Sequence, residues 1–370
     1  MKRAVKRIIL IIVAVIIVLA AVFVCIYFTR FQTMNSIEKL TDYDDGYNLY
    51  RMDVKYSYDL DRIINYGITD TQSFIDAVVK EALPLLPVTI KVPSFGCTAF
   101  TLTDNDGDVH MGRNYDFKLD TSAMLVYCTP KDGYKSVAFA ALNNVSADMP
   151  DESIRTRLAT LLAPLVCLDG MNEKGVSIAV LTLDSEATVQ DTEKQTIATS
   201  LAIRLVLDRA ATTEEAVALL EGYDMLAVNG RDYHFYITDA SGDGRVVEYD
   251  CESKTRDLVA TPTDAVTNFY VMYKEKVLPN QKNGIYGHGM ERYDAVHDVF
   301  EKQEGNYTND TVWDALRSAA QDPNPKDVTS NTQWSINYNN TDLTAEIALR
   351  RNWEDVMRYD LEENTVVIEQ

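Results

Sequence analysis

The sequence predicts an α+β fold of stacked helix and sheet layers, preceded by one apolar helix at the N-terminus. Alternating apolar and polar residues predict strands that pair as hairpins, starting with residues 98–104 and 109–112 around an Asn-Asp-Gly turn. Pairs of helical segments, such as 199–210 and 212–221, separate the hairpins. This order favours stacked α and β layers over a doubly wound parallel sheet. The apolar helix is expected at residues 8–28.

Residues 8–28 are an uncharged run long enough to cross a bilayer. At about 1.5 Å per residue the run spans roughly 30 Å, the thickness of a hydrocarbon core. It is longer than the apolar part of most secretory signals, so we expect an uncleaved anchor rather than a removed signal peptide. Basic residues before the run predict a single-pass protein with a cytoplasmic N-terminus and an extracytoplasmic body: Lys2, Arg3, Lys6 and Arg7.

The charge of the chain is unevenly distributed. The formal net charge is −21, yet residues 1–30 contain no acidic residue, and most of the acidity lies in 97–370. This acidity argues against a nucleic-acid partner, because phosphate binding needs a basic surface. A composition of 46% hydrophobic and 25% charged residues is ordinary for a globular protein.

The five cysteines do not form a disulfide framework. Cys25 lies in the apolar run, and the other four are scattered over a large body. Their spacing leaves open whether any two of them pair.

Residues 31–96 differ from the body in composition and in predicted secondary structure. Residues 41–58 are rich in Asp and Tyr. Residues 70–83 are predicted to be a helix with Phe74, Val78 and Ala82 on one face. Two prolines, Pro84 and Pro87, end it.

The body, residues 97–370, shows no internal repeat and no linker, so we expect one domain. Its further strands are predicted at 124–128, 136–141, 176–183, 233–238, 245–249, 333–338 and 344–349. Further helices are predicted at 153–162, 293–301 and 311–320.

The residues with the clearest chemical potential lie around the first hairpin. Cys97 opens the first strand, and the return strand continues into Arg113 and Asp116. The hairpin brings the return strand beside Cys97, and a neighbouring cation raises the thiolate fraction of a cysteine. A buried structural cysteine explains the same residue equally well.

The segment resembles the start of the mature chain in the choloylglycine hydrolase family of N-terminal-nucleophile hydrolases. This family includes bile-salt hydrolases, penicillin V acylases and related linear-amide C–N hydrolases. The resemblance rests on four motifs in the family's order. They are Cys97 with the Asp106-Gly107 turn and Gly112-Arg113-Asn114-Tyr115-Asp116, then Asp169-Gly170-Met171-Asn172-Glu173-Lys174-Gly175, then Val266-Thr267-Asn268, and then Glu291-Arg292-Tyr293.

The resemblance implies a four-layer αββα sandwich and a cysteine nucleophile that starts the mature chain. The free α-amine of that cysteine, with a pKa of roughly 7.7–8.0, serves as the base. No cofactor and no metal are implied. The histidines show no close pair with metal-ligand spacing, and we interpret them as ordinary surface or core residues: His110, His234, His288 and His297.

The resemblance also implies roles for four further side chains. Asp116 holds the α-amine of Cys97, and Arg113 favours the thiolate and contacts substrate. Asn268 donates to the oxyanion, where the loss of one donor costs about 10²–10³ in rate. Arg292 supports the site electrostatically. Without the ordered motifs, a surface salt bridge for Arg113 and Asp116 and a turn role for Asn268 are the simpler interpretations.

One position departs from the family pattern. Relatives commonly carry an asparagine at the end of the strand that follows the D-G-M-N-E-K-G turn, whereas this chain has Thr182 there. A threonine hydroxyl or a backbone N–H group can still donate to an oxyanion. Thr182 and Asn172 are further candidates for oxyanion or substrate contacts.

Cys97 can use its α-amine only after the bond from Gly96 is cut. We therefore expect autoproteolysis between Gly96 and Cys97, with glycine tolerating the strained turn that such a step requires. The predicted organisation is a basic tip and anchor (1–30), an extracytoplasmic pro-segment (31–96) and a catalytic domain (97–370).

Three functions remain open from the sequence. The first is an anchored extracytoplasmic amidase or acylase that acts on a small N-acyl amide. The second is an acyltransferase of the same superfamily, and the third is a catalytically silent binding protein of the cell envelope. The sequence leaves the substrate and the oligomeric state undetermined.

Overall fold

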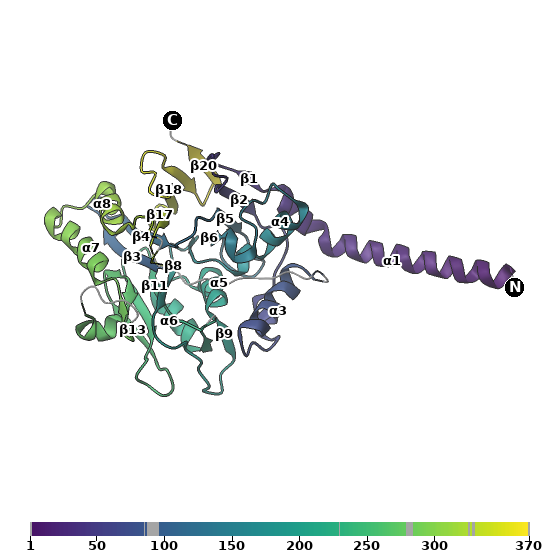
Figure 1. Cartoon of the computed structure of the whole chain (residues 1–370), viewed down its shortest axis with the longest axis horizontal. Helices are drawn as coiled ribbons and strands as arrows, with labels where there is room; N and C mark the ends of the chain where they lie inside the picture. Colours follow the sequence, from purple (N-terminus) through teal and green to yellow (C-terminus); the bar gives the residue numbers. More distant parts are fainter. Residues whose placement is uncertain are drawn as a thin grey trace.

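The computed structural model describes residues 2–84, 86, 96–228, 230–278, 284–324, 326–327 and 330–368. Most of the segment just before the expected cleavage point, residues 87–95, lies outside these described residues, as does residue 85. Figure 1 shows a rounded body with one long helix projecting from it. The body is organised around two large sheets.

The first sheet has nine strands and is mainly antiparallel. Its strands, in spatial order, are β1 (Glu38–Lys39), β2 (Leu49–Asp53), β5 (Ala123–Cys128), β6 (Ser136–Ala141), β7 (Asp169–Asn172), β8 (Ser177–Leu183), β11 (Asp232–Thr238), β12 (Arg245–Tyr249) and β13 (Leu258–Pro262).

The second sheet has seven strands, and each neighbouring pair is antiparallel. In spatial order they are β14 (Ala265–Val266), β3 (Gly96–Thr103), β4 (Val109–Asp116), β17 (Thr332–Asn339), β18 (Thr344–Leu349), β19 (Met357–Asp360) and β20 (Thr365–Ile368). Two small pairs complete the strands: β9 (Thr196–Ala198) with β10 (Asp224–Leu226), and β15 (Asn268–Phe269) with β16 (Gly287–His288).

The two large sheets face each other, with helices on their outer faces. β3 contacts β8 across the sheets, α5 (Thr199–Arg209) packs on β7 and β8, and α6 (Thr213–Glu221) contacts β11. On the other side α8 (Asn309–Ala319) packs on β4, and its neighbour α7 (Met290–Gln303) contacts β14. Figure 1 shows these two helix pairs on different sides of the body. The predicted mixed α+β fold is confirmed.

Most predicted elements are present, and three strands have the predicted bounds: β6, β12 and β18. The predicted helix at 153–162 is shorter: α4 (Ile154–Ala159) continues as a 3-10 helix, η2 (Thr160–Leu165). Pro164 lies inside this tighter segment and has no N–H group to donate. The prediction omitted short or polar strands, among them β13, β19 and β20, because their sequences lack a clear alternation. The remaining helical segments are α2 (Leu60–Ile64), η1 (Leu142–Val145) and η3 (Val271–Lys276).

The N-terminal segment is built into the first sheet. β2 pairs in parallel with β5 from Leu49–Ala123 to Asp53–Tyr127. The predicted helix at 70–83 is observed as α3 (Thr71–Ala82), capped by Asp70. Its expected apolar face is fully buried in the core: Phe74, Val78 and Ala82.

The N-terminal helix α1 (Lys2–Asn35) extends away from the body, with the N-terminus at its far end (Figure 1). The helix over residues 6–35 is long and apolar enough to cross a membrane. A signal sequence near the N-terminus meets the same criteria of length and composition. The end of α1 is fixed to the body. Tyr27 donates its hydroxyl to the Pro84 carbonyl, and Arg30 donates to the carbonyls of Glu81 and Ala82 at 2.6 and 2.7 Å.

Candidate active site

Cys97 is the second residue of β3 and is fully buried. The register pairs Cys97 with Tyr115 and Gly96 with Asp116. Directly opposed residues of an antiparallel pair point to the same face, and faces alternate along a strand. The thiol of Cys97 therefore shares a face with Tyr115 and Arg113, and Asp116 lies on the other face.

Two side chains hold the backbone of Cys97. Its N–H group donates to Asn268 Oδ1 at 2.8 Å, and its carbonyl accepts a hydrogen bond from Arg292 Nη1. Arg292 also donates through Nη2 to Asn268 Oδ1 at 2.8 Å and through Nη1 to the Thr98 hydroxyl at 3.0 Å. Residues from β3, β15 and α7 thus converge on the Cys97 backbone.

Arg113 lies on the thiol side of Cys97. Its guanidinium is fully buried and donates to the carbonyl of Val180 at 2.9 Å. Burial raises the pKa of the Cys97 thiol to about 12, and the adjacent Arg113 charge opposes this rise without overcoming it. In this structure the thiol is therefore protonated near neutral pH, and forming the thiolate requires a base.

Asp169 is the counter-ion of Arg113, a role that was not among those expected from the sequence. Its Oδ2 lies 3.3 Å from Arg113 Nε, and it also accepts hydrogen bonds from Tyr338 at 2.6 Å and from the indole of Trp334 at 3.3 Å. Burial raises the pKa of Asp169, while the Arg113 charge opposes the rise. Asp169 is the first residue of the second motif, so that motif was the available signal.

Asp116 lies on the opposite face of β4, toward the layer of α7 and α8. Its carboxylate accepts hydrogen bonds from Thr332 and Gln321, both at 2.7 Å, and lies 3.6 Å from Arg292. Burial raises the pKa of Asp116, and Arg292 opposes this rise. The Cys97 backbone N–H group donates to Asn268 in this structure, and the expected contact of Asp116 with a free Cys97 α-amine stays a prediction.

The two further candidates have different surroundings. Asn268 Nδ2 donates to the carbonyl of Thr182 at 2.8 Å and lies 3.3 Å from its hydroxyl, so Thr182 joins the group around Cys97. Asn172 does not join it. Its amide oxygen accepts from the N–H groups of Lys174 and Val176, and its Nδ2 donates to carbonyls at the end of α5. Asn172 therefore stabilises the turn between β7 and β8.

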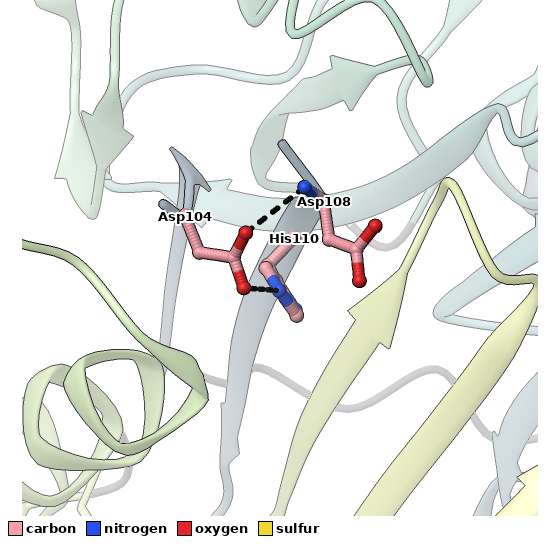
Figure 2. A group of neighbouring side chains, drawn as sticks. All are labelled: Asp104, Asp108 and His110. Carbon is pink, nitrogen blue, oxygen red and sulfur yellow. Dashed lines mark hydrogen bonds and ion pairs between the residues drawn. The ribbon is translucent and has the colours of Figure 1, made fainter. Parts of the chain in front are cut away.

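One group of metal-ligand side chains lies at the other end of the hairpin (Figure 2). Asp104, Asp108 and His110 have ligand atoms within 4.8 Å of one another. His110 is accounted for by protein partners, since its Nδ1 lies 3.0 Å from Asn337 Oδ1 and its Nε2 lies 3.4 Å from Asp104. Seven residues of β-strand, roughly 24 Å, separate Asp104 from Cys97, so this group takes no part in chemistry at the cysteine.

An open groove of about 850 Å³ begins at Phe117, the residue after Asp116. Tyr47 from the N-terminal segment lines it together with Leu119, Asn144 and Met149. A volume of this size suits a small organic molecule. Three carboxylates also line the groove: Asp120, Asp148 and Glu152.

The five cysteines are all free thiols. Their spacing left open whether any two of them pair, and in this structure none of the five forms a disulfide bond. Cys128 and Cys167 are buried, and burial raises the pKa of both thiols.

Comparisons with known proteins match part of this chain to one family and find solved structures of similar fold. Residues 97–256 match the family described as linear amide C–N hydrolases, choloylglycine hydrolase family. A comparison with curated protein sequences gave no match.

Two solved structures illustrate the fold. Penicillin V acylase from Agrobacterium tumefaciens is 19% identical, with a TM-score of 0.50, covering 72% of this chain and 87% of that one. A variant of conjugated bile acid hydrolase from Clostridium perfringens is 16% identical, with a TM-score of 0.52, covering 74% of this chain and 97% of that one. At these identities the likeness shows the fold. The family match covers residues 97–256, within the body that contains the four ordered motifs, so this part of the chain is similar to the choloylglycine hydrolase family of linear amide C–N hydrolases.

Proposed function

We propose that this protein is a membrane-anchored extracytoplasmic amidase or acylase that hydrolyses a linear, non-peptide amide through Cys97. The observation that carries the proposal is the convergence of Asn268 and Arg292 on the backbone of Cys97, with Arg113 at its thiol. A cysteine held at its nitrogen, its carbonyl and its sulfur by polar groups is more than a structural core residue requires.

Maturation precedes catalysis in this proposal. The Cys97 sulfur attacks the carbonyl carbon of Gly96, the C–N bond breaks, and the nitrogen takes up a proton. The product is a Gly96 thioester and a free Cys97 amine. Water then hydrolyses the thioester, releasing the Gly96 carboxylate and restoring the thiol. Asn268 Oδ1 already accepts a hydrogen bond from this nitrogen and is placed to hold the liberated amine.

The liberated amine then serves as the base for turnover. It accepts the thiol proton, the sulfur attacks the substrate amide carbonyl, and the amine leaving group takes the proton. Hydrolysis of the acyl-thioester completes the cycle. Thr182 and the Asn268 amide supply oxyanion donors once Asn268 Nδ2 exchanges its Thr182 carbonyl partner for the oxyanion.

The N-terminal segment remains bound after cleavage in this proposal. β2 contributes a full strand to the first sheet, and α3 buries its apolar face in the core. Arg30 and Tyr27 tie α1 to the end of α3. Residues 8–28 would then tether the cleaved catalytic chain to the membrane, with the N-terminus in the cytoplasm.

Two measurements test the proposal. Intact-mass analysis and N-terminal sequencing of detergent-purified protein should find a chain that starts at Cys97 and co-purifies with residues 1–96. A panel of penicillin V, a glycine-conjugated bile acid, an N-acyl amino acid and an N-acyl homoserine lactone should include at least one substrate. The Cys97→Ala variant should stay full length and inactive. A wild-type chain that remains uncut yet hydrolyses amides would defeat the free-amine mechanism.

An acyltransferase shares the same acyl-thioester and differs only in the acceptor. Adding a primary amine to the panel and analysing the products separates transfer from hydrolysis. A Cys97→Ala variant equal to wild type in every assay would favour a catalytically silent binding protein instead.

A further inference from the structure

We propose that His288, hydrogen-bonded to Asp184, is a positioning residue that holds Asn268 and Arg292 against Cys97. The inference rests on the proposed function, and it assigns a role to a histidine that the sequence analysis interpreted as ordinary. Its basis is the segment Gly287-His288-Gly289, which consists of the short strand β16 and the N-cap residue of α7.

The two glycines allow this segment to approach both functional side chains. His288 pairs directly with Asn268 in the β15–β16 ladder. Gly287 has a φ of +96°, and a Cβ atom there would overlap the Asn268 carbonyl oxygen. Gly289 has a φ of +91°, and a Cβ atom there would overlap the guanidinium of Arg292. Both positions thus require glycine for conformation and for space.

Asp184 ties this segment to the strand that carries Thr182. It is the residue directly after β8, two positions beyond Thr182. Its Oδ2 lies 2.7 Å from His288 Nδ1, and its Oδ1 accepts from Arg231 at 3.0 Å. The carboxylate is 5% exposed and the imidazole 11%, so water competes little with this bond.

The Asp184–His288 hydrogen bond therefore closes a ring of contacts around Asn268. From Asn268 the ring runs to Thr182 by hydrogen bond, along the chain to Asp184, across to His288, and back to Asn268 through the ladder. Two contacts of this ring link β15 and β16 to the end of β8. Without the Asp184–His288 hydrogen bond, only the one from the Asn268 amide to Thr182 would remain. Misplacement of a catalytic group by about 1 Å costs up to about 100-fold in rate.

The hydrogen-bonding pattern specifies which nitrogen matters. An ionised carboxylate only accepts, so Nδ1 of His288 carries the proton in this bond. Nε2 has no hydrogen-bond partner in the part of the chain that the structure describes. An asparagine side chain can place its N–H group near the position of Nδ1, whereas a glutamine reaches toward that of Nε2. His288→Asn and His288→Gln therefore form a discriminating pair.

The experiment measures kcat and KM for the best substrate of the panel. We expect His288→Gln and Asp184→Ala to lower kcat roughly 10- to 100-fold with KM changed less than about twofold, because positioning and not affinity is lost. His288→Asn should stay within about threefold of wild type. His297→Asn is the matched control, since His297 also bonds an aspartate, Asp264, at 2.9 Å but on the outer helix α7. It should match wild type.

A second readout does not depend on turnover. Hydrogen–deuterium exchange at residues 268–269 and 287–288 should be faster in His288→Gln and Asp184→Ala than in wild type and His288→Asn. If no amide of the panel is a substrate, the proposed function fails. Hydrogen–deuterium exchange would still test whether the Asp184–His288 hydrogen bond holds β15 and β16 in place. Equal exchange in all variants, or His288→Asn as impaired in kcat as His288→Gln, overturns the proposal.

Discussion

The two ends of the β3–β4 hairpin carry similar kinds of side chain in different surroundings. At the Cys97 end, Arg113 and Asp116 are fully buried, and their partners come from distant parts of the chain. At the turn end, Asp104 is held mainly by its neighbours Asp106, Asp108 and His110, and the turn itself is exposed.

The difference shows what burial does to charged residues. A buried charge needs partners in place, and the loss of one partner leaves the other desolvated and unpaired. A charge near solvent can turn to water instead, so its pair contributes little to stability. The Cys97 end is therefore the place where single substitutions should have large effects.

The largest expected effect concerns the reactivity of Cys97 in the full-length chain, before the cleavage that we propose. A thiol pKa of about 12 in place of 9.0 lowers the thiolate fraction at pH 8 roughly a thousandfold. Mass spectrometry after brief iodoacetamide treatment should find the full-length species labelled at Cys251 but not at Cys97. The cleaved species should be labelled at Cys97 as well. Labelling of Cys97 in the full-length species as fast as that of Cys251 would show that burial does not suppress this thiol.

The next effect is on stability. Asp169→Ala leaves the buried Arg113 guanidinium without its counter-ion and should lower the free energy of unfolding by about 3–5 kcal/mol. Urea unfolding of the full chain in detergent measures this. If burial is irrelevant, Asp169→Ala will be no less stable than a matched substitution at the turn.

That matched substitution is Asp104→Asn at the exposed end. It keeps an oxygen that can accept the N–H groups of Asp106 and Asp108, and it removes only the charge facing His110. We expect a loss of about 1 kcal/mol or less in the same unfolding assay. A loss as large as that of Asp169→Ala would erase the contrast between the two ends.

The smallest effect is the pH dependence of a half-exposed pair. The hydrogen bond that His297 donates to the Asp264 carboxylate raises the pKa of His297 above 6.5. A raised histidine pKa stabilises the fold fully below 6.5, and this contribution is lost as pH rises through the folded value. The destabilisation by His297→Gln should therefore be a few tenths of a kcal/mol greater at pH 5.5 than at pH 8.5. NMR titration of His297 checks the direction of the shift.

The sequence was sufficient for much of the fold because its local patterns are strong. The strand 136–141 is a short, nearly continuous apolar run, and the helix that begins after Asp70 has a regular apolar spacing and a cap. All of these signals act over a few residues. The strands that escaped prediction, such as β13 with Pro262 and the polar β19, owe their existence to pairing partners. β-propensity is largely a matter of such neighbours.

Part of the candidate site could be foreseen in the same way. The hairpin turn alone placed the strand with Arg113 beside Cys97, and the motif order pointed to Asn268 and Arg292. The roles of Asp169, Gly287 and His288 could not be read from the chain. Each depends on a contact with a residue at least 19 positions away, such as Arg113 for Asp169 and Asp184 for His288.

By itself the sequence determined the apolar N-terminal helix, the hairpin that presents Cys97 and the ordered motifs of the family, because all of these are properties of contiguous segments. Only the tertiary structure decided that Arg113 and Asp116 serve opposite faces of β4, that Asn172 stabilises a turn, and that residues from β15 and α7 meet at the Cys97 backbone. The physical reason is that burial and long-range hydrogen bonding, which set the state of each charged group here, exist only when the two sheets and their helices are assembled.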